Sequence, residues 1–149
     1  MIQRTGIVLF MLLTLYPLAA QDSGRRGITT PNAPAAIGPY SQAVTAGTMI
    51  FVAGQLGLDP LTGAFVEGGI EAQTHRALEN IKAILEADSS GMKDVVSCTV
   101  YLKDLEDFSK MNAVYARFFP APAPARATIQ VARLPKDGLV EISCIAVRQ

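Results

Sequence analysis

The sequence has no tryptophan, a single histidine, two cysteines and a formal net charge of zero at pH 7. His75 has no cysteine or histidine nearby that could complete a zinc site of ordinary spacing, so we expect no metal and place His75 on a solvated helix face. Nucleic-acid-binding domains usually carry a basic excess or a stripe of Lys and Arg, and neither is present. The composition therefore argues against a metal centre and against a nucleic-acid partner.

What the chain does contain is enough apolar sequence for one folded domain. Half of its 149 residues are hydrophobic, which excludes a disordered chain. We expect a signal peptide over residues 1–20, a polar spacer over 21–30 and a single domain over 31–149.

The first segment has the three-part pattern of a secretory signal peptide. Arg4 precedes the apolar run 7–16, and Pro17 is followed by small residues that suit cleavage near Ala20. The run is about half of the roughly 20 residues that a membrane-spanning helix needs. We expect export to the periplasm or the medium, with no membrane association after cleavage. The alternatives are an uncleaved anchor or a mis-assigned start codon, and the latter would leave the protein in the cytoplasm.

Hydrophobic periodicity predicts the order β-β-α-β-α-β-β, an α+β domain with one sheet and two helices packed on one face. The predicted strands cover 48–56, 64–66 and 95–102, followed by ATIQVARL and VEISCIAV near the C-terminus, and the predicted helices cover 69–87 and the segment after Asp104. A turn at 59–63 would join the first two strands into a hairpin, Gly91 would stop the first helix and Asp104 would cap the second. By the same reasoning the last two strands would pair as a hairpin.

Both cysteines fall on predicted core faces. Alternation places Cys98 with Val96, Val100 and Leu102, and it places Cys144 among similar apolar residues of the last strand. They are either two buried free thiols or one disulfide, which export would permit.

A basic and an acidic residue stand on the two C-terminal strands, where their neighbours are apolar or small. Arg126 opens the first of these strands and Glu141 lies early in the second, each on the more polar side of its strand. Charged side chains in such surroundings are rare unless they are paired or functional. We therefore hypothesise that Arg126 holds a carboxylate-bearing small molecule and that Glu141 helps a water molecule to attack it.

Three further residues are candidates for the same site. Tyr40 follows Gly38 and Pro39 in a loop and is either a ligand-facing phenol or a packing aromatic. Gly54 interrupts a predicted strand, which is typical of a bulge or of a close approach to the backbone. Asn112, beside the apolar stripe of the second helix, is either a solvated amide or a hydrogen-bonding group aimed at a site.

Nearly everything after residue 30 resembles the RidA (YjgF) family. The resemblance rests on separated segments in the same order, namely AIGPYSQAV, MIFVAGQLGLDP, QTHRALENIKAIL, VVSCTVYLKDLEDFSKMNAVYARFF and PARATIQVARLPKDGLVEISCIAV. It implies a fold similar to bacterial chorismate mutase, with VEISCIAV as a central strand beside VVSCTVYL rather than paired with ATIQVARL. It also implies a homotrimer with pockets at the subunit interfaces.

The resemblance further implies an activity without cofactor or metal, the hydrolysis of 2-imino and enamine acids such as 2-iminobutanoate and 2-iminopropanoate to 2-keto acids and ammonia. Arg126 matches the arginine that binds the substrate carboxylate, and Glu141 matches the glutamate that positions water. Tyr40, Gly54 and Asn112 match pocket residues. The alternatives are a non-catalytic trimeric binder of small carboxylates, or an exported homologue with a chaperone-like or ribonuclease-like activity.

Two pocket positions depart from the family pattern, and export is a third departure because the family is mostly cytosolic or organellar. Ala53 stands where a serine is common, so one hydroxyl is lost beside Gly54. Thr128 stands where a cysteine is common, which keeps a hydroxyl at the substrate-binding site and argues against obligatory thiol chemistry.

Overall fold

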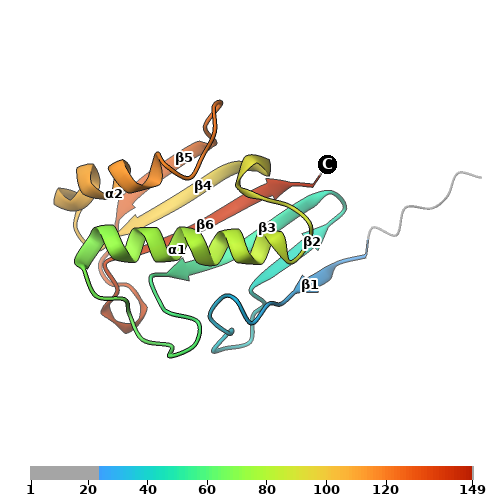
Figure 1. The fold of residues 1–149 in the computed structure, drawn as a ribbon, viewed down its shortest axis with the longest axis horizontal. Helices are drawn as coiled ribbons and strands as arrows, with labels where there is room; N and C mark the ends of the chain where they lie inside the picture. Colours follow the sequence, from blue (N-terminus) through green and yellow to red (C-terminus); the bar gives the residue numbers. More distant parts are fainter. Residues whose placement is uncertain (1–23, 149) are drawn as a thin grey trace, which may run out of the picture.

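Two helices cover one face of a six-stranded mixed sheet in the computed structural model, which describes residues 24–148 (Figure 1). The strands are β1 Arg26–Ile28, β2 Ala43–Ala46, β3 Met49–Leu56, β4 Val95–Leu102, β5 Ala125–Gln130 and β6 Val140–Val147, and the helices are α1 Gly69–Glu86 and α2 Phe108–Tyr115. Short 3₁₀ turns lie at η1 Met92–Asp94, η2 Leu105–Asp107 and η3 Pro135–Asp137. The predicted α+β architecture, with both helices on one face, is confirmed, but the predicted order of elements is wrong because β1 and β2 precede β3, where no strand was predicted.

The order of strands across the sheet is β1-β2-β3-β6-β4-β5. The last strand, β6, lies between β3 and β4 and is antiparallel to both, while β4 and β5 form a parallel pair. The hairpin expected from the order of the last two strands is therefore wrong, and the central β6 that the family resemblance implied is confirmed.

Helix α1 covers the middle of the sheet because one of its faces is continuously apolar. Its inward side chains are buried, at 5% exposure or less, and include Ile70, Ala77, Leu78, Ile81, Ile84 and Leu85. They form one core with buried residues of the strands, among them Ile50, Val100 and Ile142. Full burial of such a side chain stabilises the fold by about 1.5–3 kcal/mol, so this core fixes the helix on the sheet.

The end of α1 differs from the prediction. Ser89, and not Gly91, adopts the left-handed backbone conformation, with φ of 58°, and Gly91 is extended. The Ser90 N–H donates to the Leu85 carbonyl oxygen at 3.0 Å, which satisfies a carbonyl group of the last helical turn. Helix α1 itself ends at Glu86, one residue before the predicted end, and the left-handed residue that follows it is Ser89 rather than Gly91.

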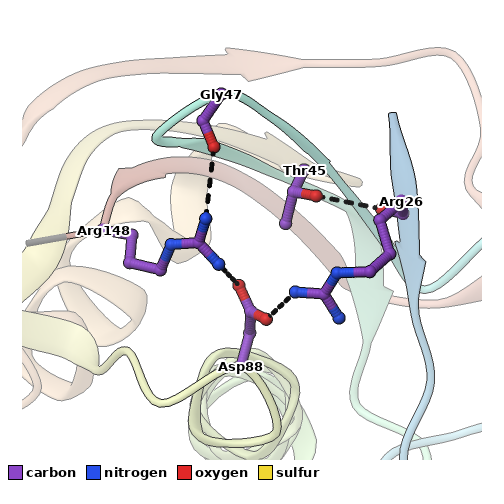
Figure 2. Close-up of polar contacts among 5 residues, drawn as sticks. All are labelled: Arg26, Thr45, Gly47, Asp88 and Arg148. Carbon is purple, nitrogen blue, oxygen red and sulfur yellow. Dashed lines mark hydrogen bonds and ion pairs between the residues drawn. The ribbon is translucent and has the colours of Figure 1, made fainter. Parts of the chain in front are cut away.

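A buried carboxylate at this end of α1 links both ends of the described chain (Figure 2). Asp88 forms ion pairs with Arg26 of β1 and with Arg148, which follows β6, and Arg148 also donates to the Gly47 carbonyl oxygen. The arginines bring positive charge to a helix C-terminus whose own last turn has no basic residue. Strand β1 lies within the segment predicted to be a spacer, so residues 26–28 of that segment belong to the sheet.

The other local predictions are partly confirmed. The turn at 59–63 is present, with the Asp59 carboxylate accepting from the Leu61 and Thr62 N–H groups, but the predicted strand 64–66 is reduced to a single bridge between Leu58 and Phe65. Asp104 accepts from the Glu106 N–H and so caps η2, which leads into α2.

Two expectations concern membranes and export. No helix within residues 24–148 combines the length and the hydropathy that a bilayer span requires. The expected signal peptide lies outside the described residues.

Candidate active site

The sheet separates the two charged residues that the sequence singled out. Arg126 pairs in parallel register with Cys98, a buried residue of the core, so its side chain points to the helix-covered face. Glu141 stands between Val140 and Ile142, which are both fully buried in the core, so its side chain points to the open face. The polar sides of the two strands therefore face opposite ways, and Arg126 and Glu141 do not meet within one chain.

Arg126 is held by three residues of α2. Its Nη2 donates to Oδ1 of Asn112 at 2.8 Å, and its guanidinium carbon lies 4.5 Å from the ring centroid of Tyr115 and 5.6 Å from that of Phe108. These three positions recur at helical spacing, so one face of α2 presents an amide and two rings to the same cation. We call Arg126, Asn112, Phe108 and Tyr115, together with Thr128, the arginine cluster.

The positive charge of Arg126 is not neutralised within the described chain. No carboxylate among residues 24–148 forms an ion pair with it. The donors that Asn112 does not use can therefore bind a ligand. Asn112 is half-buried and its amide oxygen accepts from Arg126, and its place in a substrate site stays a prediction.

Thr128 is two residues further along β5 and shares the face of Arg126. Its Oγ1 is buried and has no hydrogen-bond partner in the part of the chain that the structure describes. A buried hydroxyl without a partner costs free energy, and a bound ligand would remove that cost.

Sequence reasoning placed Tyr115 only in the apolar stripe of α2 and missed its contact with Arg126. The ring is buried, and this burial raises the pKa of its hydroxyl above the usual tyrosine range. The available signal was its spacing of three residues from Asn112, which places both on one helix face.

The two cysteines lie beneath this cluster. Cys98 and Cys144 are buried free thiols, directly opposite each other on β4 and β6. Their mutual hydrogen bond lowers the pKa of Cys98 and raises that of Cys144. Val96 does not share their face as predicted, because a register shift between Val95 and Ser97 turns it outward to 47% exposure.

Glu141 lines a cavity of about 420 Å³ beside the C-terminal end of β3 and the start of β6. The walls are mostly apolar and include Pro34, Ala35, Ile37, Ala53, Leu56, Leu58 and Pro135. Burial raises the pKa of Glu141 because the ionised carboxylate loses water, and no side chain among residues 24–148 pairs with it. The cavity therefore contains a partly buried carboxylate with a raised pKa and no ion-pair partner among the described residues.

Gly54 is required at this point by a close approach. The register of β3 with β6 shifts between Val52 and Gln55, which confirms the predicted bulge. A Cβ atom at position 54 would overlap Oε1 of Glu141. Only glycine leaves room for the carboxylate beside the bulge.

Tyr40 stands at the mouth of the same cavity. It lines the cavity at 51% exposure, and its hydroxyl oxygen accepts a hydrogen bond from the Ile37 N–H at 3.4 Å. The ring is therefore not buried in the core of the described chain, and its role toward a ligand stays a prediction. We call Tyr40, Gly54 and Glu141 with the cavity walls the glutamate cavity.

The candidate residues thus form two groups, with Arg126, Asn112 and Thr128 in one and Tyr40, Gly54 and Glu141 in the other. Both groups are formed by side chains and main-chain atoms of the protein itself. Within residues 24–148 no group of three or more His, Cys, Asp or Glu side chains is placed to hold a metal ion.

Comparison with known proteins identifies the family. The model of the Endoribonuclease L-PSP family matches residues 30–148. A RutC family protein of Pyrococcus horikoshii is 56% identical over 122 residues, which cover 82% of this chain and 97% of that protein. The 2-iminobutanoate/2-iminopropanoate deaminase of Salmonella typhimurium is 51% identical over 125 residues, which cover 82% of this chain and 97% of that protein.

A solved structure gives the same result for the fold. E. coli TdcF with bound serine aligns with a TM-score of 0.79 and 43% identity, covering 83% of this chain and 99% of that one. The sequence motifs, the strand order and these matches agree. The chain belongs to the RidA/YjgF family, and the family model that matches it is described as Endoribonuclease L-PSP.

Proposed function

We propose that this protein hydrolyses 2-imino acids and their enamine tautomers, such as 2-iminobutanoate and 2-iminopropanoate, to 2-keto acids and ammonia. The observation that carries the proposal is the unneutralised Arg126 guanidinium, oriented by Asn112 and two rings in a chain that also presents a partly buried Glu141 carboxylate. The activity named for the Salmonella relative supports it.

One chain does not complete this site, because the arginine cluster and the glutamate cavity lie on opposite faces of the sheet. The arginine cluster of one copy would meet the glutamate cavity of the next. Since two different surfaces join, the arrangement is head-to-tail, which forms a ring when the rotation between copies closes. We assign the ring as a homotrimer, as the family resemblance implies.

The open face of the sheet fits such an assembly. Its strands expose large apolar side chains, including Met49, Phe51, Ile129 and Val147 at 37–46% exposure. An apolar sheet face of this kind is typically covered by a partner. Neighbouring copies would cover it in the trimer.

Binding would begin with the substrate carboxylate. The planar guanidinium of Arg126 donates two parallel hydrogen bonds to it, which fixes the position of the adjacent C=N carbon. Asn112 and the rings hold the guanidinium, and the Thr128 hydroxyl gains a partner. Orientation of this kind lowers a barrier by up to roughly 7–11 kcal/mol in the most favourable cases.

The reaction then needs one base and one water molecule. The water oxygen bonds to the imine carbon, one of its protons passes to the Glu141 carboxylate, and the C=N electron pair moves to nitrogen. Glu141 returns the proton to that nitrogen. In the resulting carbinolamine, Glu141 takes the remaining hydroxyl proton and passes it to the amino nitrogen. The C–N bond then breaks as the C=O bond forms, releasing ammonia and the 2-keto acid. The raised pKa of Glu141 brings it nearer to neutral pH, where a general base is more effective.

The deaminase assay separates this proposal from its alternatives. An amino-acid oxidase generates the imine in place, and keto-acid release is followed with and without the protein. We expect acceleration that Arg126→Ala abolishes. Calorimetric binding of 2-ketobutyrate without any turnover would favour the trimeric carboxylate binder, and full activity in Arg126→Ala would contradict the proposal.

We also propose an exported location, supported by the pattern of the first 20 residues. N-terminal sequencing of the protein recovered from its native host tests it. Cleavage near Ala20 is the expected result, whereas an intact Met1 in a cytosolic fraction would contradict export.

A further inference from the structure

We infer that Gln42 is a positioning residue for the proposed deaminase, because its buried amide fixes the loop that carries Tyr40 against the bulge that carries Gly54. Gln42 is the last residue of the loop 29–42, which joins β1 to β2, and it is 3% exposed. The inference depends on the proposed function only for its activity measurement.

The side-chain amide of Gln42 binds the start of its own loop. Its Oε1 accepts from the Thr30 N–H at 2.7 Å. Its Nε2 donates to the Pro34 carbonyl oxygen at 2.8 Å and lies 3.1 Å from the carbonyl oxygens of Thr30 and Ala33. The amide therefore closes the loop by replacing the backbone partners that a strand would supply.

The main chain of Gln42 makes the second connection. Its carbonyl oxygen accepts from the Ala53 N–H at 3.0 Å, at the bulge next to Gly54. A single residue thus links both sides of the glutamate cavity, since Pro34 and Tyr40 line one side, and the bulge with Glu141 lines the other.

The far end of the loop has little support of its own. Around Tyr40 only two hydrogen bonds are present within the described residues, from the Tyr40 N–H to the Gly38 oxygen at 2.8 Å and from the Ile37 N–H to the Tyr40 hydroxyl oxygen. Ile37 is 74% exposed, so packing does not fix this end either. The position of Tyr40 therefore depends on the base of the loop, where Gln42 is.

The first measurement is hydrogen exchange in the full chain. Gln42→Met keeps the length of the side chain and removes its polar contacts. We expect faster exchange across residues 29–41. The matched control is Thr74→Val, which removes a buried hydrogen bond from Thr74 to the Ile70 carbonyl oxygen inside α1 and leaves the loop untouched. Unchanged exchange in Gln42→Met, or equally fast loop exchange in Thr74→Val, would overturn the inference.

The second measurement separates positioning from general stability. If Gln42→Met displaces the loop that carries Tyr40, KM for the imine should rise by about tenfold. The value of kcat should stay nearly unchanged, because the proposed reacting groups lie on β5 and β6 and not on this loop. Tyr40→Phe should then add little to Gln42→Met, since the two act through the same loop. Additive effects, or an unchanged KM, would contradict positioning.

A third measurement keeps the two proposals apart. Calorimetry with 2-ketobutyrate should show an affinity about tenfold weaker in Gln42→Met than in the wild-type chain. A wild-type chain that binds the keto acid without turning over imines would end the deaminase proposal, and the affinity ratio would still decide the role of Gln42. If Gln42→Met does not fold, Gln42→Glu, which keeps the Thr30 contact, takes its place in all three measurements.

Discussion

The arginine cluster and the glutamate cavity hold their charges in opposite ways. Arg126 is surrounded by an amide and two aromatic rings that fix its direction. Glu141 faces a hollow of about 420 Å³ and has no side-chain partner among the described residues. Under the proposed function, the oriented Arg126 would bind the substrate carboxylate and the unpaired Glu141 would accept a proton.

The largest loss of activity should come from substitution of Arg126, the proposed substrate-binding residue. Arg126→Ala should lower kcat/KM by about a thousandfold, because it removes the bidentate anchor and leaves a substrate carboxylate unpaired. Arg126→Lys should recover only part of this, since lysine cannot donate in a fork. Keto-acid release measures both. The control is Arg117→Ala, an exposed arginine beyond α2, which should match the wild type.

The next largest loss of activity should come from substitution of Glu141, the proposed general base. Glu141→Gln should lower kcat by about 10²- to 10⁴-fold because the general base is lost. In the wild type, kcat/KM should fall as the pH drops through the pKa of Glu141, which burial has raised above the ordinary glutamate range. A wild-type profile that is flat through this range, or a Glu141→Gln variant with normal turnover, would remove Glu141 from the mechanism.

The same carboxylate has a consequence for stability. Burial raises the pKa of Glu141 in the folded chain above its pKa in the unfolded chain, so protonation of Glu141 favours folding. This contribution to the free energy of unfolding is fully present below the unfolded-state pKa. It is lost as the pH rises through the folded-state pKa. Glu141→Gln should therefore melt at a slightly higher temperature than the wild type at pH 7, and this difference should vanish in acid.

A smaller effect should follow from filling the gap beside the carboxylate. In Gly54→Ala the new methyl group overlaps Glu141 and must displace it, so kcat/KM should fall by roughly tenfold to a hundredfold. Gly91→Ala is the matched control, since its Cβ would meet nothing within 4 Å and its backbone is extended. Equal activity in the two variants would show that Glu141 tolerates displacement.

The smallest effect concerns the ring beneath Arg126. Tyr115→Leu removes a cation–π contact of about 1 kcal/mol and should raise KM roughly fivefold. Tyr115→Phe keeps the ring and should stay close to the wild type. If the two substitutions raise KM equally, the hydroxyl and not the ring supports Arg126.

The sequence predicted the parts of the fold that depend on local pattern. Helix α1 and strands β3, β4 and β6 follow from periodicity, because each buries one face along most of its length. Strands β1 and β2 escaped prediction because both are short, and β1 is a polar segment that joins the sheet by antiparallel pairing with β2. The bulge at Val95 and Val96 also had no local signal.

For the candidate site, the sequence proposed individual residues but not their arrangement. Strand alternation shows that Arg126 and Glu141 are each on a polar side, but not on which face of the sheet that side lies. The face is set by the parallel register of β5 with β4 and by the place of β6 between two antiparallel neighbours. Both are long-range pairings, and the sequence shows them only through resemblance to a family.

The central claim is that Arg126 of one copy acts with Glu141 of another. Co-expression of Arg126→Ala with Glu141→Gln tests it most directly, because each inactive chain retains the half that the other lacks. In rings of randomly mixed subunits, about one quarter of the sites would combine two intact halves, so roughly a quarter of wild-type turnover should return. Mixed assemblies with no more activity than the two variants measured alone would show that both residues act within one chain, and would contradict the account.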